Sequence, residues 1–272
     1  MPIIPYLWLI PVGFLVGAYG TLIGAGGGFV LVPLLLLLYP TENPEVITSI
    51  SLAVVFFNAL SGSIAYARSG RIDYKSGTLF ALATIPGAIL GALTTAYIPR
   101  RTFDMVLGLL MLFGAAVLLW RPPRDLKIRE SNAQPDLVRT LNKADGAAQM
   151  YSYPLYLGVG LSLIVGYLSS LLGIGGGIIH VPVMVQILNF PVHIATATSH
   201  FVLAIMALTG TVVHILTGTF HRGVWRTLAL SLGVLLGAQL GAWLSQRVHG
   251  EWILRGLAIA LGLVGLRLLF SS

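Results

Sequence analysis

The chain has 272 residues, of which 56% are hydrophobic and 9% are charged, and its formal net charge is +7. A soluble domain usually has about 25% charged residues, so this composition excludes a soluble globular protein and predicts an integral membrane protein. The sequence contains no cysteine, which excludes disulfide bonds and thiol chemistry.

Apolar segments long enough to cross a bilayer recur along the chain, since a span needs roughly 20 residues. They lie at about 5–38, 44–67, 74–98, 103–120, 154–188, 193–216, 224–246 and 250–270. We therefore predict an all-α polytopic membrane protein with about eight transmembrane helices. No basic region precedes the first apolar segment, so we do not expect a removable signal peptide.

Segments 5–38 and 154–188 are each more than 30 residues long. At about 1.5 Å per residue, such a helix is longer than a bilayer of about 30 Å is thick. Each segment contains a glycine cluster, Gly24-Ala25-Gly26-Gly27-Gly28 in the first and Gly173-Ile174-Gly175-Gly176-Gly177 in the second. Because each glycine costs roughly 1 kcal/mol in a helix, we predict that the first helix of each half is broken at a Gly-rich loop.

The two halves of the chain resemble each other. The glycine clusters lie 149 residues apart, and between Gly17–Pro33 and Gly166–Pro182 eight of seventeen positions are identical. The similarity continues at Thr48 and Thr196, at Ser51 and Ser199, at Gly62 and Gly210, and at Gly87-Ala88-x-x-Gly91-Ala92 and Gly237-Ala238-x-x-Gly241-Ala242. We predict two transmembrane repeats, 1–120 and 154–272. Their small-xxx-small patterns favour close helix packing.

Residues 121–153 form a polar linker, which we expect to be mobile. The linker holds ten of the 25 Asp, Glu, Lys and Arg residues. With eight crossings, twelve Lys and Arg residues fall on one side of the membrane and four on the other, which predicts a multi-pass inner-membrane protein with a cytoplasmic linker and cytoplasmic termini. If the segment after each glycine cluster crosses by itself, the repeats are inverted instead of parallel, and the sequence leaves this choice open.

The glycine clusters are the predicted binding site. New half-helices would begin near Phe29 and Ile178, and their free N–H groups can bind an anion without a basic side chain. The alternative is that the glycines only permit close helix crossing. A nucleotide-binding loop is disfavoured, because no Gly-Lys-Ser/Thr sequence follows and no βαβ unit surrounds the cluster.

Polar side chains within the spans are further candidates for anion binding. They are Thr48, Ser49, Ser51 and Asn58 in the first half and Thr196, Thr198, Ser199 and His200 in the second. Their hydroxyls could instead bond to their own helices. No acidic residue falls in the middle of a predicted span, whereas sodium and proton sites commonly use a buried carboxylate. We therefore expect an anion as substrate and no metal or cofactor, and His180 or His200 would carry any coupling proton.

The doubled Gly-x-Gly-Gly-Gly-x₄-Val-Pro motif and the polar clusters that follow it resemble the TauE/SafE family of membrane permeases. The resemblance covers both halves and implies a secondary transporter for anions such as sulfite or organosulfonates, for example sulfoacetate. The motif glycines carry over at Gly24, Gly26, Gly27 and Gly28 and at Gly173, Gly175, Gly176 and Gly177. His180 and His200 have apolar counterparts in the first half, Leu31 and Leu52, so the two halves differ chemically.

We therefore expect a small oxyanion to be held between the two glycine loops and released by rocking of one repeat against the other. An anion channel with the same site is the main alternative. An enzyme is disfavoured, because no acidic residue lies near His180 or His200 in sequence. The expected partners are the small anion and the lipid bilayer, and not nucleic acid. The anion, the direction, the coupling ion and the oligomeric state, a homo-oligomer included, stay open.

Overall fold

The computed structural model describes residues 3–120, 137–142, 148–248 and 250–271, which form ten α-helices and one β-hairpin. The helices are α1 (Leu9–Ile23), α2 (Gly28–Leu38), α3 (Pro44–Arg68), α4 (Tyr74–Thr95), α5 (Arg100–Trp120), α6 (Leu155–Leu172), α7 (Gly177–Gln186), α8 (Val192–Leu216), α9 (Val224–Ser245) and α10 (Gly250–Ser271), with short 3-10 helices at Ile4–Tyr6 and Thr219–Arg222. The strands are β1 (Leu137–Asn142) and β2 (Ala148–Tyr153). The predicted helical class is confirmed.

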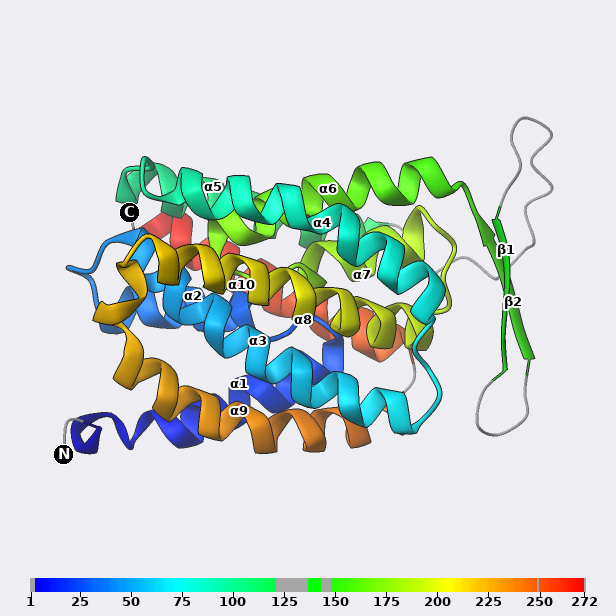
Figure 1. Cartoon of the computed structure of the whole chain (residues 1–272), viewed down its shortest axis with the longest axis horizontal. Helices are drawn as coiled ribbons and strands as arrows, with labels where there is room; N and C mark the ends of the chain where they lie inside the picture. Colours follow the sequence, from blue (N-terminus) through cyan, green and yellow to red (C-terminus); the bar gives the residue numbers. More distant parts are fainter. Residues whose placement is uncertain (1–2, 121–136, 143–147, 249, 272) are drawn as a thin grey trace.

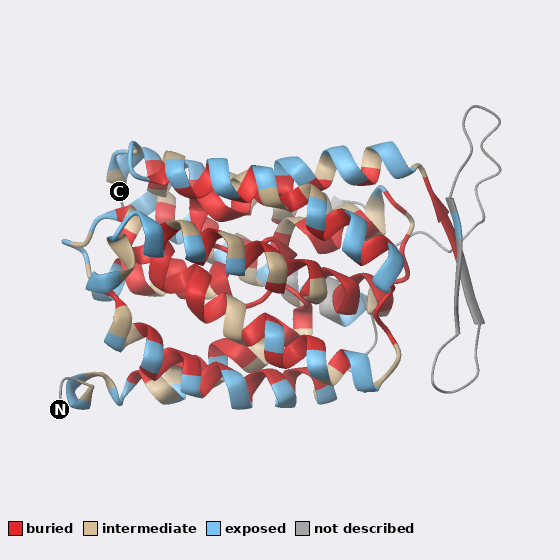
Figure 2. Cartoon of the chain, viewed as in Figure 1, coloured by how far each residue is buried: buried red, intermediate tan, exposed pale blue. Residues whose placement is uncertain are grey.

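Among the described residues, the five helices α3, α4, α6, α8 and α9 are long and apolar enough to cross a membrane. The long helices run side by side along the long axis of the molecule (Figure 1). Their outer faces are exposed, and their inner faces are buried (Figure 2). Large apolar side chains such as Phe113 and Leu236 are exposed on the outside, 69% and 68% respectively, which suits contact with lipid.

Segment 5–38, expected to be one broken span, forms two helices that turn back on each other. α1 runs inward from the end that holds the N-terminus, and α2 returns to that end (Figure 1). The 15 residues of α1 reach only about 22 Å, less than the thickness of a bilayer. α6 and α7 form the same arrangement from the opposite end. The prediction of about eight transmembrane helices counted each of these helix pairs, α1–α2 and α6–α7, as one span. Each is instead a pair of helices that turns back.

The two ends of the molecule carry different parts of the chain. Both termini lie at one end, which we call the terminal end, and the β-hairpin lies at the other, which we call the linker end (Figure 1). At the terminal end, Arg226 Nη2 lies 2.6 Å from Glu42 Oε1, joining the start of α9 to the α2–α3 loop. The termini and the β-hairpin thus lie at opposite ends of the molecule (Figure 1), and the side of the membrane on which each end lies stays a prediction.

Helices of the two halves are interleaved. α1 packs most extensively against α9, and α4 packs against α6. The small-xxx-small patterns lie at these contacts: a Cβ atom at Gly237 would overlap the carbonyl of Phe14, and one at Gly87 would overlap the carbonyl of Leu163. The glycines thus let helices from different halves approach backbone to backbone.

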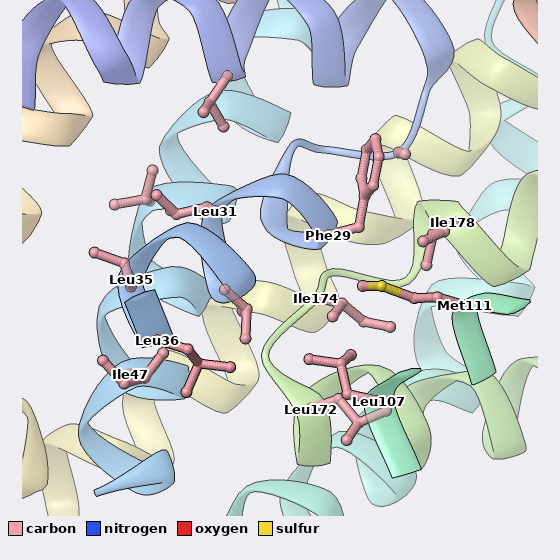
Figure 3. Close-up of a cluster of buried hydrophobic side chains, with 14 of the residues drawn as sticks. Phe29, Leu31, Leu35, Leu36, Ile47, Leu107, Met111, Leu172, Ile174 and Ile178 are labelled. Atoms are coloured by element: carbon pink, nitrogen blue, oxygen red, sulfur yellow. The ribbon is translucent and has the colours of Figure 1, made fainter. Parts of the chain in front are cut away.

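The largest apolar cluster surrounds the short helix α2 and the start of α7 (Figure 3). Phe29, Leu31 and Leu35 of α2 are fully buried. Ile174, in the loop between α6 and α7, lies in the same cluster. The start of each short helix is thus buried in protein, which satisfies the requirement that an interrupted backbone at membrane depth be shielded from lipid.

The β-hairpin lies within the segment that was expected to be a polar linker, and the sequence did not predict it. Residues 121–136 and 143–147, to which the expected mobility also applied, lie outside the described residues. β1 and β2 pair antiparallel, with Leu137 opposite Tyr153. Tyr151 Oη donates to Asp73 Oδ2 (2.6 Å), and Tyr153 Oη donates to Ser76 Oγ (2.6 Å). β2 is thereby bound to the start of α4.

Replacing Tyr151 with phenylalanine is expected to destabilise the protein by about 1.5–3 kcal/mol, because a buried hydrogen bond to a carboxylate is lost. The measurement is the thermal unfolding midpoint of the purified protein in detergent. Tyr156→Phe is the control, since Tyr156 is 64% exposed. Equal unfolding midpoints for the two variants would contradict this role of Tyr151.

Candidate functional site

The first glycine loop joins α1 to α2 through left-handed backbone angles. Gly24 follows α1 at φ 83°, and Gly27 precedes α2 at φ 80°. These angles cost a residue with a side chain about 1–2 kcal/mol. α1 ends here because the Gly20 carbonyl accepts the N–H groups of Ala25 (2.8 Å) and Gly26 (3.1 Å) instead of continuing the helical pattern.

The second glycine loop joins α6 to α7 with similar geometry and one difference. Gly173 and Gly175 have φ angles of 67° and 72°. Gly176, the residue just before α7, has a helical φ of −61°, whereas its counterpart Gly27 is left-handed. The two loops therefore follow similar paths, but the backbone conformation of the residue just before the short helix differs between them.

The two loops touch each other at the centre of the molecule. A Cβ atom at Gly28 would overlap the Ile174 carbonyl, and a Cβ atom at Gly177 would lie 2.5 Å from Ala25 Cα. Val55 of α3 and Leu203 of α8 pack against both loops. Residues that are far apart in the sequence thus form one glycine-lined contact.

The helices that follow the loops begin with free N–H groups. Neither Gly27 nor Gly176 makes a side-chain cap. Within the described part of the chain, the N–H groups of Gly28, Phe29, Gly177 and Ile178 have no hydrogen-bond partner, and all four residues are buried. Two uncapped helix starts facing one shared contact concentrate partial positive charge there.

Several predicted hydroxyl ligands bond within the protein. Thr48 Oγ1 donates to Glu45 O (3.0 Å), Ser49 Oγ to Val46 O (2.8 Å) and Thr196 Oγ1 to Val192 O (2.7 Å). These three hydroxyls bond to their own helices, as the alternative reading of the sequence allowed. Their helices nevertheless lie close to the loops, because Thr48 is packed against Gly173 and Thr196 against Gly24.

Two other predicted hydroxyls hold neighbouring segments in place. Ser51 Oγ donates to the Gly173 carbonyl (2.6 Å), which ties α3 to the second glycine loop. Thr198 Oγ1 accepts the Asp73 N–H (3.0 Å), which ties α8 to the turn before α4. Ser51 therefore lies at the loops, and Thr198 lies toward the linker end.

Asn58 and His200 come together in a buried cluster with Thr21 of α1. Thr21 Oγ1 donates to Asn58 Oδ1 (3.2 Å) and lies 3.2 Å from His200 Nε2. Asn58 Nδ2, Ser199 Oγ and His200 Nδ1 have no hydrogen-bond partner in the described residues, and all three residues are fully buried. Buried polar atoms without partners are uncommon in native structures, so this cluster is the strongest candidate for side-chain contact with a ligand.

His180, the other predicted proton carrier, lies in α7 away from this cluster. Its Nε2 is 3.3 Å from Ser162 Oγ, and its ring meets Phe80 edge to face at 5.8 Å. Its neighbours are therefore α6 and α4, and the structure does not bring it together with His200.

Thr21 and Tyr66 belong to the cluster, and sequence analysis missed both. Tyr66 Oη donates to the Thr21 carbonyl (2.5 Å), and its ring meets His200 edge to face at 5.5 Å. Thr21 lies three residues before the glycine loop, and its counterpart Ser170 is also a hydroxyl residue, a signal that could have identified it. Tyr66 gives no such signal, because its partner is a backbone carbonyl.

No group of three His, Cys, Asp or Glu side chains in the described ranges could hold a metal ion. The buried carboxylate of Asp73 lies at the linker end and accepts the N–H groups of Lys75 and Ser76. The polar groups described at the glycine loops and in the cluster beside them are therefore backbone N–H groups, hydroxyls, one amide and one imidazole. Such groups suit an anion better than a cation.

Comparison with known proteins places these features in a family. A family model described as Sulfite exporter TauE/SafE matches residues 9–268. The probable membrane transporter protein YunE of Bacillus subtilis is 33% identical over 98% of both chains. YdhB of the same organism is 27% identical over 96% of this chain and 99% of its own, and a probable membrane transporter protein of Methanocaldococcus jannaschii is 24% identical over 96% and 94%. No solved structure matches the chain.

Proposed function

Because the chain belongs to the TauE/SafE family of membrane transporters, we propose that it is a secondary transporter that moves a small oxyanion across the cytoplasmic membrane. The substrate class is sulfite or an organosulfonate such as sulfoacetate. The family description names sulfite export, and the curated relatives carry transporter names.

The observation that carries this proposal is the pair of uncapped helix starts that face each other at the loop contact. The N–H groups of Gly28, Phe29, Gly177 and Ile178 would replace part of the hydration shell of an oxyanion. Asn58 and His200 supply side-chain contacts nearby. In the described residues no Lys or Arg side chain hydrogen-bonds to the loops, and neutral donors favour release of the anion as well as its binding.

We propose that the two halves are inverted repeats. Each half has a turned-back pair followed by three crossing helices, and the halves begin at opposite ends of the molecule. Rocking of one repeat against the other does not fit the interleaved packing. The moving units would instead be two mixed bundles, α1, α3 and α9 against α4, α6 and α8, which meet along α3 and α8.

The orientation follows from the Lys and Arg residues. The described linker end has Arg68, Arg71, Lys75, Arg247 and Arg255, and the terminal end has Arg100, Arg101, Arg222, Arg226 and Arg267. The linker adds six further basic residues between α5 and α6. The positive-inside rule therefore favours a cytoplasmic linker end and termini on the opposite face of the membrane.

The test is exchange of anions by the purified protein in liposomes. Vesicles loaded with unlabelled sulfite or sulfoacetate are diluted into the labelled anion, and uptake is followed with sulfate, thiosulfate and acetate as competitors. A carrier is expected to show saturable uptake that internal substrate accelerates, because the loaded site returns faster than the empty one.

Residues 23–29 and 171–178 are all buried, so the structure corresponds to a closed site, and a carrier must open it alternately to each side. Uptake that neither saturates nor responds to internal substrate would instead support the alternative of an anion channel. Uptake no faster than in protein-free vesicles for both anions would contradict the proposed substrate class.

A further inference from the structure

Within the described residues, buried polar side-chain atoms without partners lie beside both glycine loops, Ser169 Oγ and Ser170 Oγ near the second loop and an amide and an imidazole nitrogen near the first. Asn58 Nδ2 and His200 Nδ1 lack partners among the described residues, and they lie one helical turn from Val55 and Leu203, which contact Gly26. At the corresponding positions of the other repeat the chain has Met206 and Leu52. An unpaired buried donor or acceptor costs about 1–3 kcal/mol, so a polar ligand is favoured here, and this side differs from the other in having an amide and an imidazole.

The hydrogen bonds around Thr21 determine which nitrogen of His200 carries the proton. A threonine hydroxyl has one proton, and that of Thr21 is donated to Asn58 Oδ1. With the Asn58 amide oriented so that Oδ1 faces Thr21, the contact between Thr21 Oγ1 and His200 Nε2 (3.2 Å) is donated by the imidazole. Neutral His200 then has its only proton on Nε2, and Nδ1 presents a bare lone pair.

Among the described residues around His200, a backbone carbonyl but no carboxylate is placed to offset a positive charge. Tyr66 of α3 meets the ring at 5.5 Å, and its hydroxyl is used by the Thr21 carbonyl. The Arg71 guanidinium lies 4.9 Å from the Tyr66 ring and adds a positive charge nearby. Thr21 of α1 and the backbone of Gly24, the residue after α1, hydrogen-bond to the ring. No carboxylate in the described part of the chain bonds to His200, so an empty site favours the neutral imidazole.

We propose that the oxyanion is carried together with one proton, which lies between His200 Nδ1 and an oxygen of the anion. Asn58 Nδ2 donates to a second oxygen. The proton comes from water on the side to which the site is open, and it leaves with the anion on the other side. This inference rests on the proposed anion transport and adds the coupling ion to it.

The proton and the anion each compensate the charge of the other in the site. A bare Nδ1 lone pair repels an anion oxygen, and a protonated imidazole without an anion is an uncompensated buried charge. Binding of the proton and the anion is therefore mutually favourable. With one proton, a monoanion such as hydrogensulfite crosses the membrane as a neutral pair, and a dianion such as sulfoacetate crosses with one negative charge instead of two, which lowers the cost of moving charge through a medium of low dielectric constant.

The test uses liposomes that exchange sulfite or sulfoacetate, with the membrane potential clamped by potassium and valinomycin. A pH gradient, acidic outside, is expected to drive accumulation of the anion, and a pyranine signal is expected to show protons entering with it. His200→Gln keeps an N–H group for Thr21 and removes Nδ1. It should lose accumulation driven by the pH gradient, and the pH dependence of exchange should flatten.

His214→Gln is the matched control, because His214 is also fully buried in α8 but lies fourteen residues further along, toward the terminal end. It should keep the coupling. Wild-type exchange without proton movement would overturn the inference and leave the proposed transporter intact, whereas absence of exchange would overturn the transporter itself. Coupling that survives in His200→Gln would also overturn it. Should that variant unfold, the wild-type proton signal alone decides.

Discussion

Gly177→Ala is expected to abolish anion exchange while the protein still inserts into the membrane. The added Cβ atom would overlap the Gly24 carbonyl and lie 2.5 Å from Ala25 Cα and 2.9 Å from Ala25 C. Ordinary carbon contacts are about 3.5–4.0 Å. The atoms in the way belong to the backbone of the other loop, so the loops must separate, at a cost of about 1–3 kcal/mol.

The measurement is exchange in liposomes alongside the unfolding midpoint in detergent. Gly28→Ala should behave alike, since its Cβ would overlap the Ile174 carbonyl. Gly160→Ala is the control: nothing lies within 4 Å of its Cβ position, and alanine should stabilise α6 by up to about 1 kcal/mol. Wild-type exchange by Gly177→Ala would show that contact between the loops is not needed for transport.

Gly27 and Gly176 occupy equivalent positions in the two repeats, but alanine substitutions at these positions are expected to have different effects. An alanine at Gly27 would have φ 80° and a Cβ atom 2.8 Å from the Val16 carbonyl oxygen. An alanine at Gly176 would have φ −61°, and its nearest neighbour would be Met206 Sδ at 3.2 Å. Gly27→Ala should therefore impair exchange and stability more than Gly176→Ala does.

Residues 1–120 produced without the second half are expected to fail to form a stable protein. α1 would lose α9, and α4 would lose α6, which are their most extensive contacts. The glycine-lined faces around Gly87 and Gly17 would then be left without the helices that they pack against.

Co-expression of residues 1–120 with residues 148–272 is expected to restore a complex that exchanges anions, because the missing contacts are supplied in trans. An affinity tag on one half should recover the other half in equal amount. A first half that is monodisperse alone, with a cooperative unfolding transition, would contradict the interleaved packing. An uncut chain purified in parallel serves as the reference.

The positions of the glycine loops could be predicted from the sequence because their cause is local. Four glycines in five residues destabilise a helix wherever they occur, and α1 and α6 do end beside these clusters. The return of α2 toward its starting end also had a local signal. α2 has only 11 residues, which make about 17 Å of helix. The sequence analysis counted these residues with the preceding span.

The partners of the helices could not be predicted, because they depend on contacts between the two halves. The pattern at Gly87 indicated a close helix neighbour but not that the neighbour is α6. Of the predicted polar residues, Thr48, Ser51 and Thr196 lie against the loops, and most of the predicted hydroxyls donate to backbone carbonyls. Which polar atoms remain free, such as Asn58 Nδ2, depends on side-chain geometry that a one-dimensional pattern does not contain.

The pairing of α1 with α9 also sets the order in which the protein can be completed during synthesis. α1 leaves the ribosome well before α9, which spans Val224–Ser245. Contacts between residues so distant in sequence form late. The face of α1 at Gly13 and Gly17 therefore has no partner helix until most of the chain has been inserted. A nascent chain that stops before Val224 therefore leaves this face of α1 without its partner helix.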